Sequence, residues 1–312
     1  MAVPESVPFE YVGGHLIAVP VTIDDSVRTR VLFDTGIGVS LLTPRLGERL
    51  RIRPQERAFT ARRMSGQEVS VPLYSLSSLS LGAREESNVT VGVLDLLPSD
   101  GSLPPEFTGI EGILSPGAFP GTPVTVDPEA RELVLEDEAS MVDRLRRGVS
   151  VPVRVDRDGP SVGVFLDLVL PDRSGATVEV DTGTPGIILH TRFMAGLGVR
   201  AGAESVRTVR GADETGHRYT RHFAKVPGPF RVRAAPELRQ DGLEVMFQEI
   251  IYDGLVGDAF LRSFRTTYDL SGSRMILSAR GTEGRPPRAP RKARSSKRIV
   301  GGRAVPSPPR PQ

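Results

Sequence analysis

The chain of 312 residues contains no cysteine, which excludes disulfides, thiolate metal sites and a cysteine nucleophile. Long apolar runs are also missing, since the longest, Leu16 to Ile23, is interrupted by Pro20 and Thr22. This run is far shorter than a membrane-spanning helix requires. The N-terminus has neither a basic cluster nor an apolar segment of signal-peptide length. We therefore expect a cytoplasmic protein with no membrane contact.

Several sequence signatures of catalysis are missing too. The chain has no Gly-x-Ser-x-Gly elbow, no Walker-type Gly-Lys pair and no dinucleotide-binding fingerprint. Its histidines are scattered, and no acidic cluster joins them at the spacing of metal ligands. They are His15, His190, His217 and His222. We therefore expect no metal and no cofactor.

Basic residues are concentrated at the C-terminal end. Residues 282–312 contain nine Arg or Lys and one acid, so they carry +8 although the whole chain carries only +2. The other 281 residues sum to −6, and this charge gives no reason to expect a nucleic-acid-binding core. With seven prolines, the segment has the composition of a disordered tail. Two interpretations stay open: a solvating tail, which we favour, and a patch that contacts nucleic acid or another polyanion.

The most informative motif occurs twice. Asp34-Thr35-Gly36 is followed 147 residues later by Asp181-Thr182-Gly183. In both places a β-rich segment leads into the Asp, and an aliphatic run follows the Gly turn. A single Asp-Thr-Gly is an ordinary turn. Two copies at matching places indicate that the chain positions the same carboxylate twice.

The segments around the two motifs repeat as well. Each half contains a strand-like hairpin before the Asp, and each ends in a hairpin with a Leu eight residues after an Asp, at Asp127 and at Asp269. We interpret these two aspartates as hairpin-start residues that accept local N–H bonds. The halves are repeats of about 130 residues spanning 12–279. The pattern predicts an all-β protein of two lobes with short helices, one of them after Thr43-Pro44.

The repeat also sets the expected domain boundaries. Residues 1–140 form an N-terminal lobe and residues 141–281 a C-terminal lobe, joined by a charged, helix-like connector over 136–149. Residues 282–312 form the tail. A pseudo-twofold axis between the lobes would bring Asp34 and Asp181 together. At a separation of about 4 Å and an effective dielectric near 20, two charged carboxylates repel by roughly 4 kcal/mol, so the pair shares one proton.

These residues resemble the pepsin-like and retropepsin-like aspartic proteases. The segments that carry the resemblance are Phe33-Asp34-Thr35-Gly36, Val180-Asp181-Thr182-Gly183-Thr184, Gly112-Ile113-Leu114 and residues 253–260. The resemblance implies a fold of two β-barrel-like lobes and catalysis by Asp34 and Asp181. It also implies that Thr35 and Thr182 cross-link the two turns, that Gly36 and Gly183 form the tight turns, and that the Thr184 hydroxyl bonds the neighbouring carboxylate.

Three positions depart from the family pattern. Ile37 stands where the first lobe would carry a hydroxyl equivalent to Thr184, which predicts unequal surroundings for the two carboxylates. Ser115 replaces the second Gly of the first-lobe segment. No Tyr lies near the turn at Ser65-Gly66, where a pepsin-like flap carries one, and Tyr74 reads as a strand residue.

The sequence therefore predicts an aspartic endopeptidase that acts on a peptide or protein substrate in the cleft between the lobes. The alternative is a catalytically weak or inactive peptide-binding module of the same fold. A third reading is an anchoring protein whose Arg-rich tail docks to a polyanion. Because the two lobes are fused, no dimerisation is needed to form the site, and we expect a monomer.

Overall fold

The computed structural model describes residues 4–95, 104–213 and 216–279. The tail at 282–312 and its two interpretations lie outside these residues. Within the described part of the chain, no helix is long and apolar enough to cross a membrane. The described residues are mostly β-structure, as expected, with three short α-helices.

The first half forms an eight-stranded sheet, with the strand order β2-β3-β4-β9-β5-β8-β7-β6. A further pairing of β3 with β7 folds the sheet back on itself. Its elements are β2 (Glu10–Val12), β3 (Leu16–Ile23), β4 (Val27–Phe33), β5 (Leu41–Leu42), α1 (Pro44–Leu50), β6 (Arg53–Arg62), β7 (Glu68–Leu81), β8 (Arg84–Val93) and β9 (Ile110–Leu114). Tyr74 lies within β7, as predicted.

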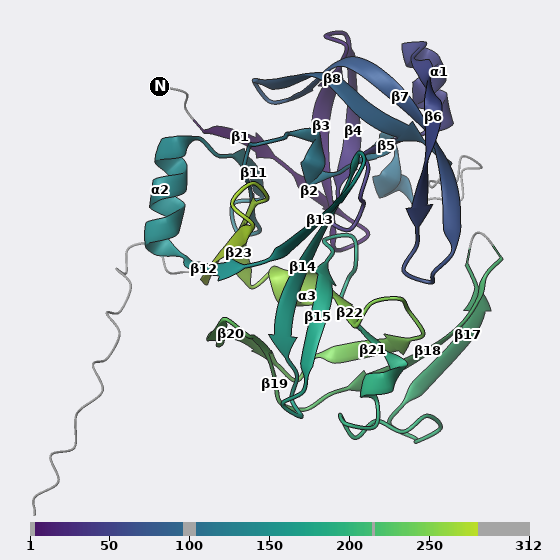
Figure 1. The fold of residues 1–312 in the computed structure, drawn as a ribbon, viewed down its shortest axis with the longest axis vertical. Helices are drawn as coiled ribbons and strands as arrows, with labels where there is room; N and C mark the ends of the chain where they lie inside the picture. The colour runs from purple at the N-terminus through teal and green to yellow at the C-terminus, as the bar shows by residue number, and fades with distance from the viewer. Residues whose placement is uncertain (1–3, 96–103, 214–215, 280–312) are drawn as a thin grey trace, which may run out of the picture.

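The second half forms a ten-stranded sheet. Nine of its strands have the order β17-β18-β21-β16-β22-β15-β14-β19-β20, and the tenth, β13, pairs with β14. Its strands are β13 (Arg154–Asp158), β14 (Ser161–Val169), β15 (Gly175–Val180), β16 (Ile187–His190), β17 (Arg207–Ala212), β18 (Arg218–Lys225), β19 (Pro229–Val232), β20 (Ala235–Asp241), β21 (Glu244–Gln248) and β22 (Gly254–Val256). Helix α3 (Asp258–Leu261) follows β22. Figure 1 shows the first half, in purple and blue, above the second half, in teal and green.

The two sheets share one central arrangement. In the first half β4 runs parallel to β9 and β9 antiparallel to β5. In the second half β15 runs parallel to β22 and β22 antiparallel to β16. The hairpin partners β3 and β14 complete the match. The structural repeat inferred from the two Asp-Thr-Gly motifs is therefore present in the strand pairing.

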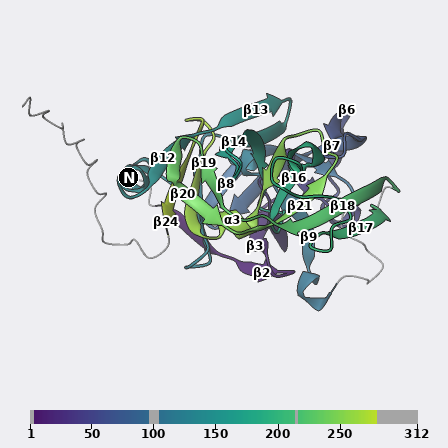
Figure 2. The same cartoon turned by 90° about the horizontal axis from the view of Figure 1, so that it is seen from below.

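A third sheet, which the sequence did not reveal, is built by both halves. Its six strands have the order β1-β11-β10-β23-β24-β12, three from each half. They are β1 (Glu5–Pro8), β10 (Val124–Asp127), β11 (Glu132–Leu135), β12 (Val149–Pro152), β23 (Phe264–Asp269) and β24 (Arg274–Ala279). In the view from below, β12 and β24 lie at one end of the molecule and the β17–β18 hairpin at the other (Figure 2).

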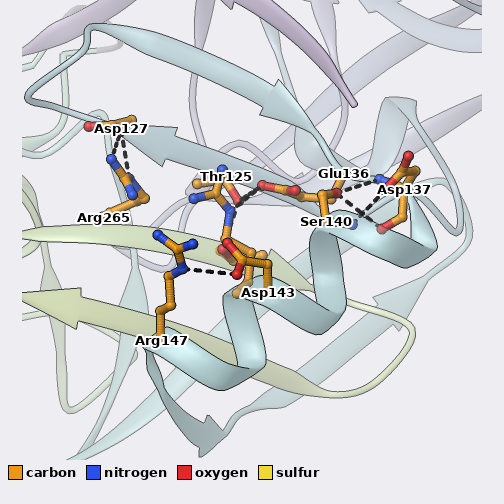
Figure 3. A network of polar contacts seen from close by, with 10 residues as sticks. Thr125, Asp127, Glu136, Asp137, Ser140, Asp143, Arg147 and Arg265 are labelled. Atoms are coloured by element: carbon orange, nitrogen blue, oxygen red, sulfur yellow. Dashed lines mark hydrogen bonds and ion pairs between the residues drawn. The ribbon is translucent and has the colours of Figure 1, made fainter. Parts of the chain in front are cut away.

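Polar contacts join the halves at the centre of this sheet (Figure 3). The Asp127 carboxylate on β10 accepts a hydrogen bond of 2.6 Å from the Arg265 guanidinium on β23. The hydroxyls of Thr125 and Thr267 lie 2.7 Å apart in the core of the sheet. Asp127 also accepts N–H bonds from Glu129 and Ala130, which confirms its interpretation as a hairpin-start residue.

The connector forms helix α2 (Glu138–Arg147), so the 140/141 boundary between the predicted lobes falls inside a helix. Asp137 caps it: its side chain accepts the Ser140 N–H, and the Ser140 hydroxyl accepts the Asp137 N–H (Figure 3). This is a capping box with Ser in the place of Glu or Gln. Glu136, two residues before the helix, links it to the six-stranded sheet. Its buried carboxylate accepts hydrogen bonds from Thr125 on β10 and from Arg144 on α2.

Candidate active site

The two Asp-Thr-Gly turns lie at the ends of matching strands. Asp34 follows β4 and Asp181 follows β15. The Asp34 N–H donates to the Leu114 carbonyl at the end of β9, and the Asp181 N–H donates to the Val256 carbonyl at the end of β22, both at 3.0 Å. The backbone of each aspartate is thus hydrogen-bonded to the Gly-containing segment of its own half.

Glycine is required in those segments because strands cross there at close range. A Cβ added to Gly112 would lie 2.5 Å from the Leu41 carbonyl oxygen, and one added to Gly254 would lie 2.3 Å from the Ile188 carbonyl oxygen. Real Cβ atoms do not approach backbone this closely. The pairing that places the aspartates therefore depends on these two glycines.

The two threonines of the motifs cross-link the turns. The Thr35 hydroxyl accepts the Thr182 N–H at 3.1 Å and donates to the Val180 carbonyl at 2.7 Å. Reciprocally, the Thr182 hydroxyl accepts the Thr35 N–H at 3.0 Å and donates to the Phe33 carbonyl at 3.3 Å. Both side chains are buried. This network fixes the two turns relative to each other and satisfies four buried backbone groups.

Each turn glycine packs against the carboxylate of the other half. A Cβ on Gly36 would lie 2.5 Å from the Asp181 Cγ, and a Cβ on Gly183 would lie 2.5 Å from the Asp34 Oδ2. Any side chain at these positions would push the two carboxylates apart. The glycines therefore allow the close approach of the two halves as well as the turns.

The two carboxylates share a hydrogen-bond donor. The Gly183 N–H reaches the Oδ1 of Asp181 at 2.8 Å and the Oδ1 of Asp34 at 3.2 Å. The Gly36 N–H donates to the same Asp34 oxygen at 2.8 Å. Burial, and then the charge of Asp181, raise the pKa of Asp34 well above its usual range. The pair therefore keeps a proton at pH values where an isolated aspartate has lost it.

The outer oxygens of the carboxylates have different surroundings. The Thr184 hydroxyl donates to the Asp181 Oδ2 at 2.6 Å, and its N–H donates to the Oδ1 at 3.0 Å. At the equivalent position of the first half, Ile37 has no hydroxyl to offer Asp34. The unequal surroundings predicted from the sequence are therefore present in the hydrogen bonds.

A hairpin from the first half contacts the second half. The turn between β6 and β7 spans Arg63 to Gln67 and is closed by two hydrogen bonds of 2.8 Å. The Met64 carbonyl accepts the Ile251 N–H at 2.9 Å. The Met64 side chain packs against a small apolar cluster of Ile188, Ile250 and Leu255. Figure 1 shows the tip of this hairpin pointing toward the β17–β18 hairpin, where Arg63 approaches Asp213 at 3.9 Å.

Sequence reasoning missed several residues near the site. Tyr252, from the second half, packs against the same cluster as Met64, although the hairpin tip at residues 63–67 carries no Tyr. The His15 ring nitrogen lies 3.1 Å from the Gly183 carbonyl. The buried carboxylate of Glu179, two residues before Asp181, was also missed. Only Glu179 leaves a signal in the sequence, as a charge between Val178 and Val180.

A large hollow lies away from the two aspartates. It has a volume of about 900 Å³ and lies beside the β17–β18 hairpin. Its lining includes His217, His222, Arg210, Arg218 and Glu249 but neither aspartate. The candidate active site is therefore defined by the hydrogen bonds of the two turns and not by cavity size.

Comparison with known proteins supports an aspartic protease. The sequence model of the aspartyl protease family matches residues 19–114, about a third of the chain, which include the first Asp-Thr-Gly. Among solved structures, the aspartic proteinase from Irpex lacteus has a similar fold, with a TM-score of 0.52 and 14% sequence identity. The match covers 89% of this chain and 97% of that proteinase. No curated protein sequence matches the chain.

The two matches support different parts of the conclusion. At 14% identity the structural match shows the fold alone, an all-β acid-protease fold of two lobes. The family match covers the first half only. Together they support the assignment of the chain to the aspartic protease family, and with it a peptidase that hydrolyses peptide bonds.

Proposed function

We propose that the protein is an aspartic endopeptidase in which Asp34 and Asp181 share one proton and activate a water molecule. The observation that carries this proposal is the single Gly183 N–H that reaches an inner oxygen of both carboxylates, at 2.8 and 3.2 Å. Two carboxylates this close do not both ionise near neutral pH. The site therefore offers a base and an acid to one substrate.

The chemistry follows from this arrangement. The ionised carboxylate takes a proton from the water as its oxygen attacks the carbonyl carbon of the peptide, and the protonated carboxyl donates to the carbonyl oxygen. The C–N bond of the resulting tetrahedral intermediate then breaks as the amine nitrogen receives a proton from the pair. The surrounding N–H donors and Thr184 hold the carboxylates in place.

An extended peptide would lie between the halves, under the β6–β7 hairpin, with strand-like hydrogen bonds to that hairpin. In the structure the hairpin tip is bonded to the second half through Met64 and Ile251. Substrate entry would require this bond to open. The hairpin would thus act as a cover that closes on the bound peptide.

The test is cleavage of a diverse peptide library from pH 3 to 8 by the wild type and by Asp34→Asn and Asp181→Asn. Each substitution should lower cleavage by about 10²–10⁴-fold, because each removes one half of the acid–base pair. Asp241→Asn is the matched control, since Asp241 is exposed on β20 and far along the sheet order from the turns. A pepstatin-type inhibitor should block the wild type.

Two results would contradict the proposal. One is undiminished cleavage by a folded Asp34→Asn variant. The other is the absence of cleavage by the folded wild type at every pH, which would favour the peptide-binding module. In that case the Asp34→Asn/Asp181→Asn double variant should still bind its ligand.

A further inference from the structure

Glu179 places a third carboxylate beside the aspartate pair. It lies on β15 two residues before Asp181, so both side chains project to the same face of the chain. Its residue surface is only 8% exposed. Among the described residues, no hydrogen-bond donor or cation lies within bonding distance of this carboxylate. Its oxygens are not among the fully enclosed side-chain atoms that lack a partner, so they stay accessible to a bound group. A mostly buried carboxylate with no partner at a reaction site points to a missing one.

The fold itself does not require a carboxylate at this position. Leu32 is the equivalent residue of the first half, two residues before Asp34 and opposite Ala18 in the hairpin. Glu179 lies opposite Phe165 in the matching hairpin and beside Leu255 on β22. Leu32 belongs to an apolar cluster. The second half therefore carries a charged group where the same backbone accepts an aliphatic side chain.

The charges that face Glu179 are mostly negative. Burial, and then the charges of Asp181, Asp34 and Asp156, raise the pKa of Glu179 to about 8. Tyr252 lies on the same side, where burial and then the charge of Glu179 raise the pKa of its phenol to about 12.

The nearby cations are engaged elsewhere. Arg154 on β13 lies 3.4 Å from Asp156 and 4.3 Å above the Phe165 ring. Arg62, at the end of β6, pairs with Glu68 at 2.9 Å. The region beside the aspartate pair thus has an excess of acid.

The surroundings of Glu179 also suit a long side chain. The rings of Phe165 and Tyr252 meet edge to face with their centroids 5.3 Å apart. Leu255 pairs with Glu179 across the strands and belongs to the cluster against which Tyr252 packs. Gly163 on β14 adds no side chain beside the carboxylate, whereas a Cβ there would lie 3.8 Å from the Glu179 Oε1. Apolar walls with one carboxylate fit the methylene stem and charged head of Arg or Lys.

We infer that Glu179 binds a basic side chain of the peptide substrate, on the second-half side of the aspartate pair, and so sets the specificity of cleavage. The inference rests on the proposed function. A bound guanidinium supplies the positive charge that the three facing acids lack, and its donors satisfy the buried carboxylate. An uncharged side chain leaves that carboxylate unpaired, which makes the site discriminate strongly.

The preference should depend on pH in a defined direction. A guanidinium binds the ionised form of Glu179, whereas the free site holds its proton below about pH 8. Binding at lower pH must therefore release a proton. The preference for a basic side chain should grow as the pH rises, by at most about tenfold per unit, and level off above about pH 8.

The test compares peptides that differ only by Arg or its uncharged isostere citrulline, scanned through each position of fluorescent decapeptides. Binding is measured by anisotropy on the Asp34→Asn variant, which removes turnover, and cleavage is measured separately on the wild type. At one position the Arg form should bind on the order of 10- to 100-fold more tightly at pH 8. Adding Glu179→Gln should reduce this ratio to below about twofold.

Two further variants sharpen the test. Glu179→Leu copies the first half and should shift the preference toward aliphatic side chains. Glu237→Gln, a change of an exposed glutamate on β20, should leave the Arg preference unchanged.

An Arg preference that survives Glu179→Gln would overturn the inference, as would the absence of any Arg preference at pH 8 or of any peptide binding. Wild-type protein that binds the Arg peptides selectively but cleaves none would contradict the proposed function: the contact of Glu179 with the basic side chain would stand, and its role in the specificity of cleavage would fall.

Discussion

Around Asp34 and Asp181 the two halves of the chain use the same backbone with different side chains. In each half the aspartate N–H is held by a carbonyl at the end of the facing strand, and a threonine reaches across to the other turn. The halves differ at Ile37 and Thr184, and at Leu32 and Glu179. They also differ at Ser115, whose equivalent is Gly257. The shared residues position the carboxylates, and the differing ones make them chemically unequal.

The Ser115 and Gly257 pair shows how differently one position can be filled. Ser115 is buried, and its hydroxyl accepts the Gly117 N–H at 3.2 Å and donates to the Gly38 carbonyl at 3.3 Å. Gly257 has no room for a side chain, because a Cβ would lie 2.0 Å from the Thr184 carbonyl oxygen. The second turn therefore packs more tightly against its supporting segment than the first.

The largest effect should come from exchanging these two residues. Gly257→Ser should destabilise the protein by more than about 3 kcal/mol or prevent folding, since the clash is with backbone that cannot move aside. Ser115→Gly should cost about 1–2 kcal/mol, through lost hydrogen bonds and a more flexible unfolded chain. Urea unfolding of both variants measures the difference. Similar losses of stability would show that the halves are packed alike there.

The threonine cross-link, in contrast, should lose the same stability whichever half is changed. Thr35→Ala and Thr182→Ala should each destabilise by about 2–4 kcal/mol, because each leaves a buried N–H and a buried carbonyl without a partner. The conservative variants Thr35→Ser and Thr182→Ser keep the hydroxyl and should recover most of that stability. Thermal unfolding of the four variants provides the measurement. Losses that differ by more than about 1 kcal/mol between the two Ala variants would contradict a symmetric cross-link.

Much of this arrangement could be predicted from the sequence because it repeats. The two Asp-Thr-Gly motifs and the Thr43-Pro44 helix start are local signals, and the structure confirms the turns, the helix and its Thr43 cap. The six-stranded sheet could not be predicted, because it pairs β10 with β23, more than 130 residues away. Such pairings leave no local pattern.

The residues near the site that the sequence did not predict were missed for the same reason. Met64 from the first half and Tyr252 from the second pack against one apolar cluster only after folding. The burial of Glu179 depends on Phe165 and Leu255, which belong to other strands. Its alternation with Val178 and Val180 reads from the sequence as an ordinary half-exposed strand residue.

The smallest expected effect concerns the outer oxygens of the carboxylates. Ile37→Thr would give Asp34 a hydroxyl donor like that of Thr184 and stabilise its ionised form. The raised pKa of Asp34 should fall, so the high-pH limb of the pH–rate profile, where the pair loses its shared proton, should move to lower pH. Thr184→Val removes the hydroxyl from the other carboxylate and should move the low-pH limb, where the pair first ionises, to higher pH.

Each limb should shift by about one pH unit. A hydrogen bond to a charged group contributes about 1.5–3 kcal/mol, and one pH unit corresponds to about 1.4 kcal/mol. Water can replace part of the lost or added hydrogen bond, which keeps the shift near the lower end. Profiles of kcat/KM for one peptide report the two limbs of the free enzyme. The combined Ile37→Thr/Thr184→Val variant exchanges the two environments and provides the control. If the two limbs belong to the pair as a unit, this exchange should return both limbs close to their wild-type positions, whereas an active range narrowed from both sides would show that each limb belongs to one residue. Profiles of the two single variants that stay in place would show that the unequal side chains do not set the titration of the pair.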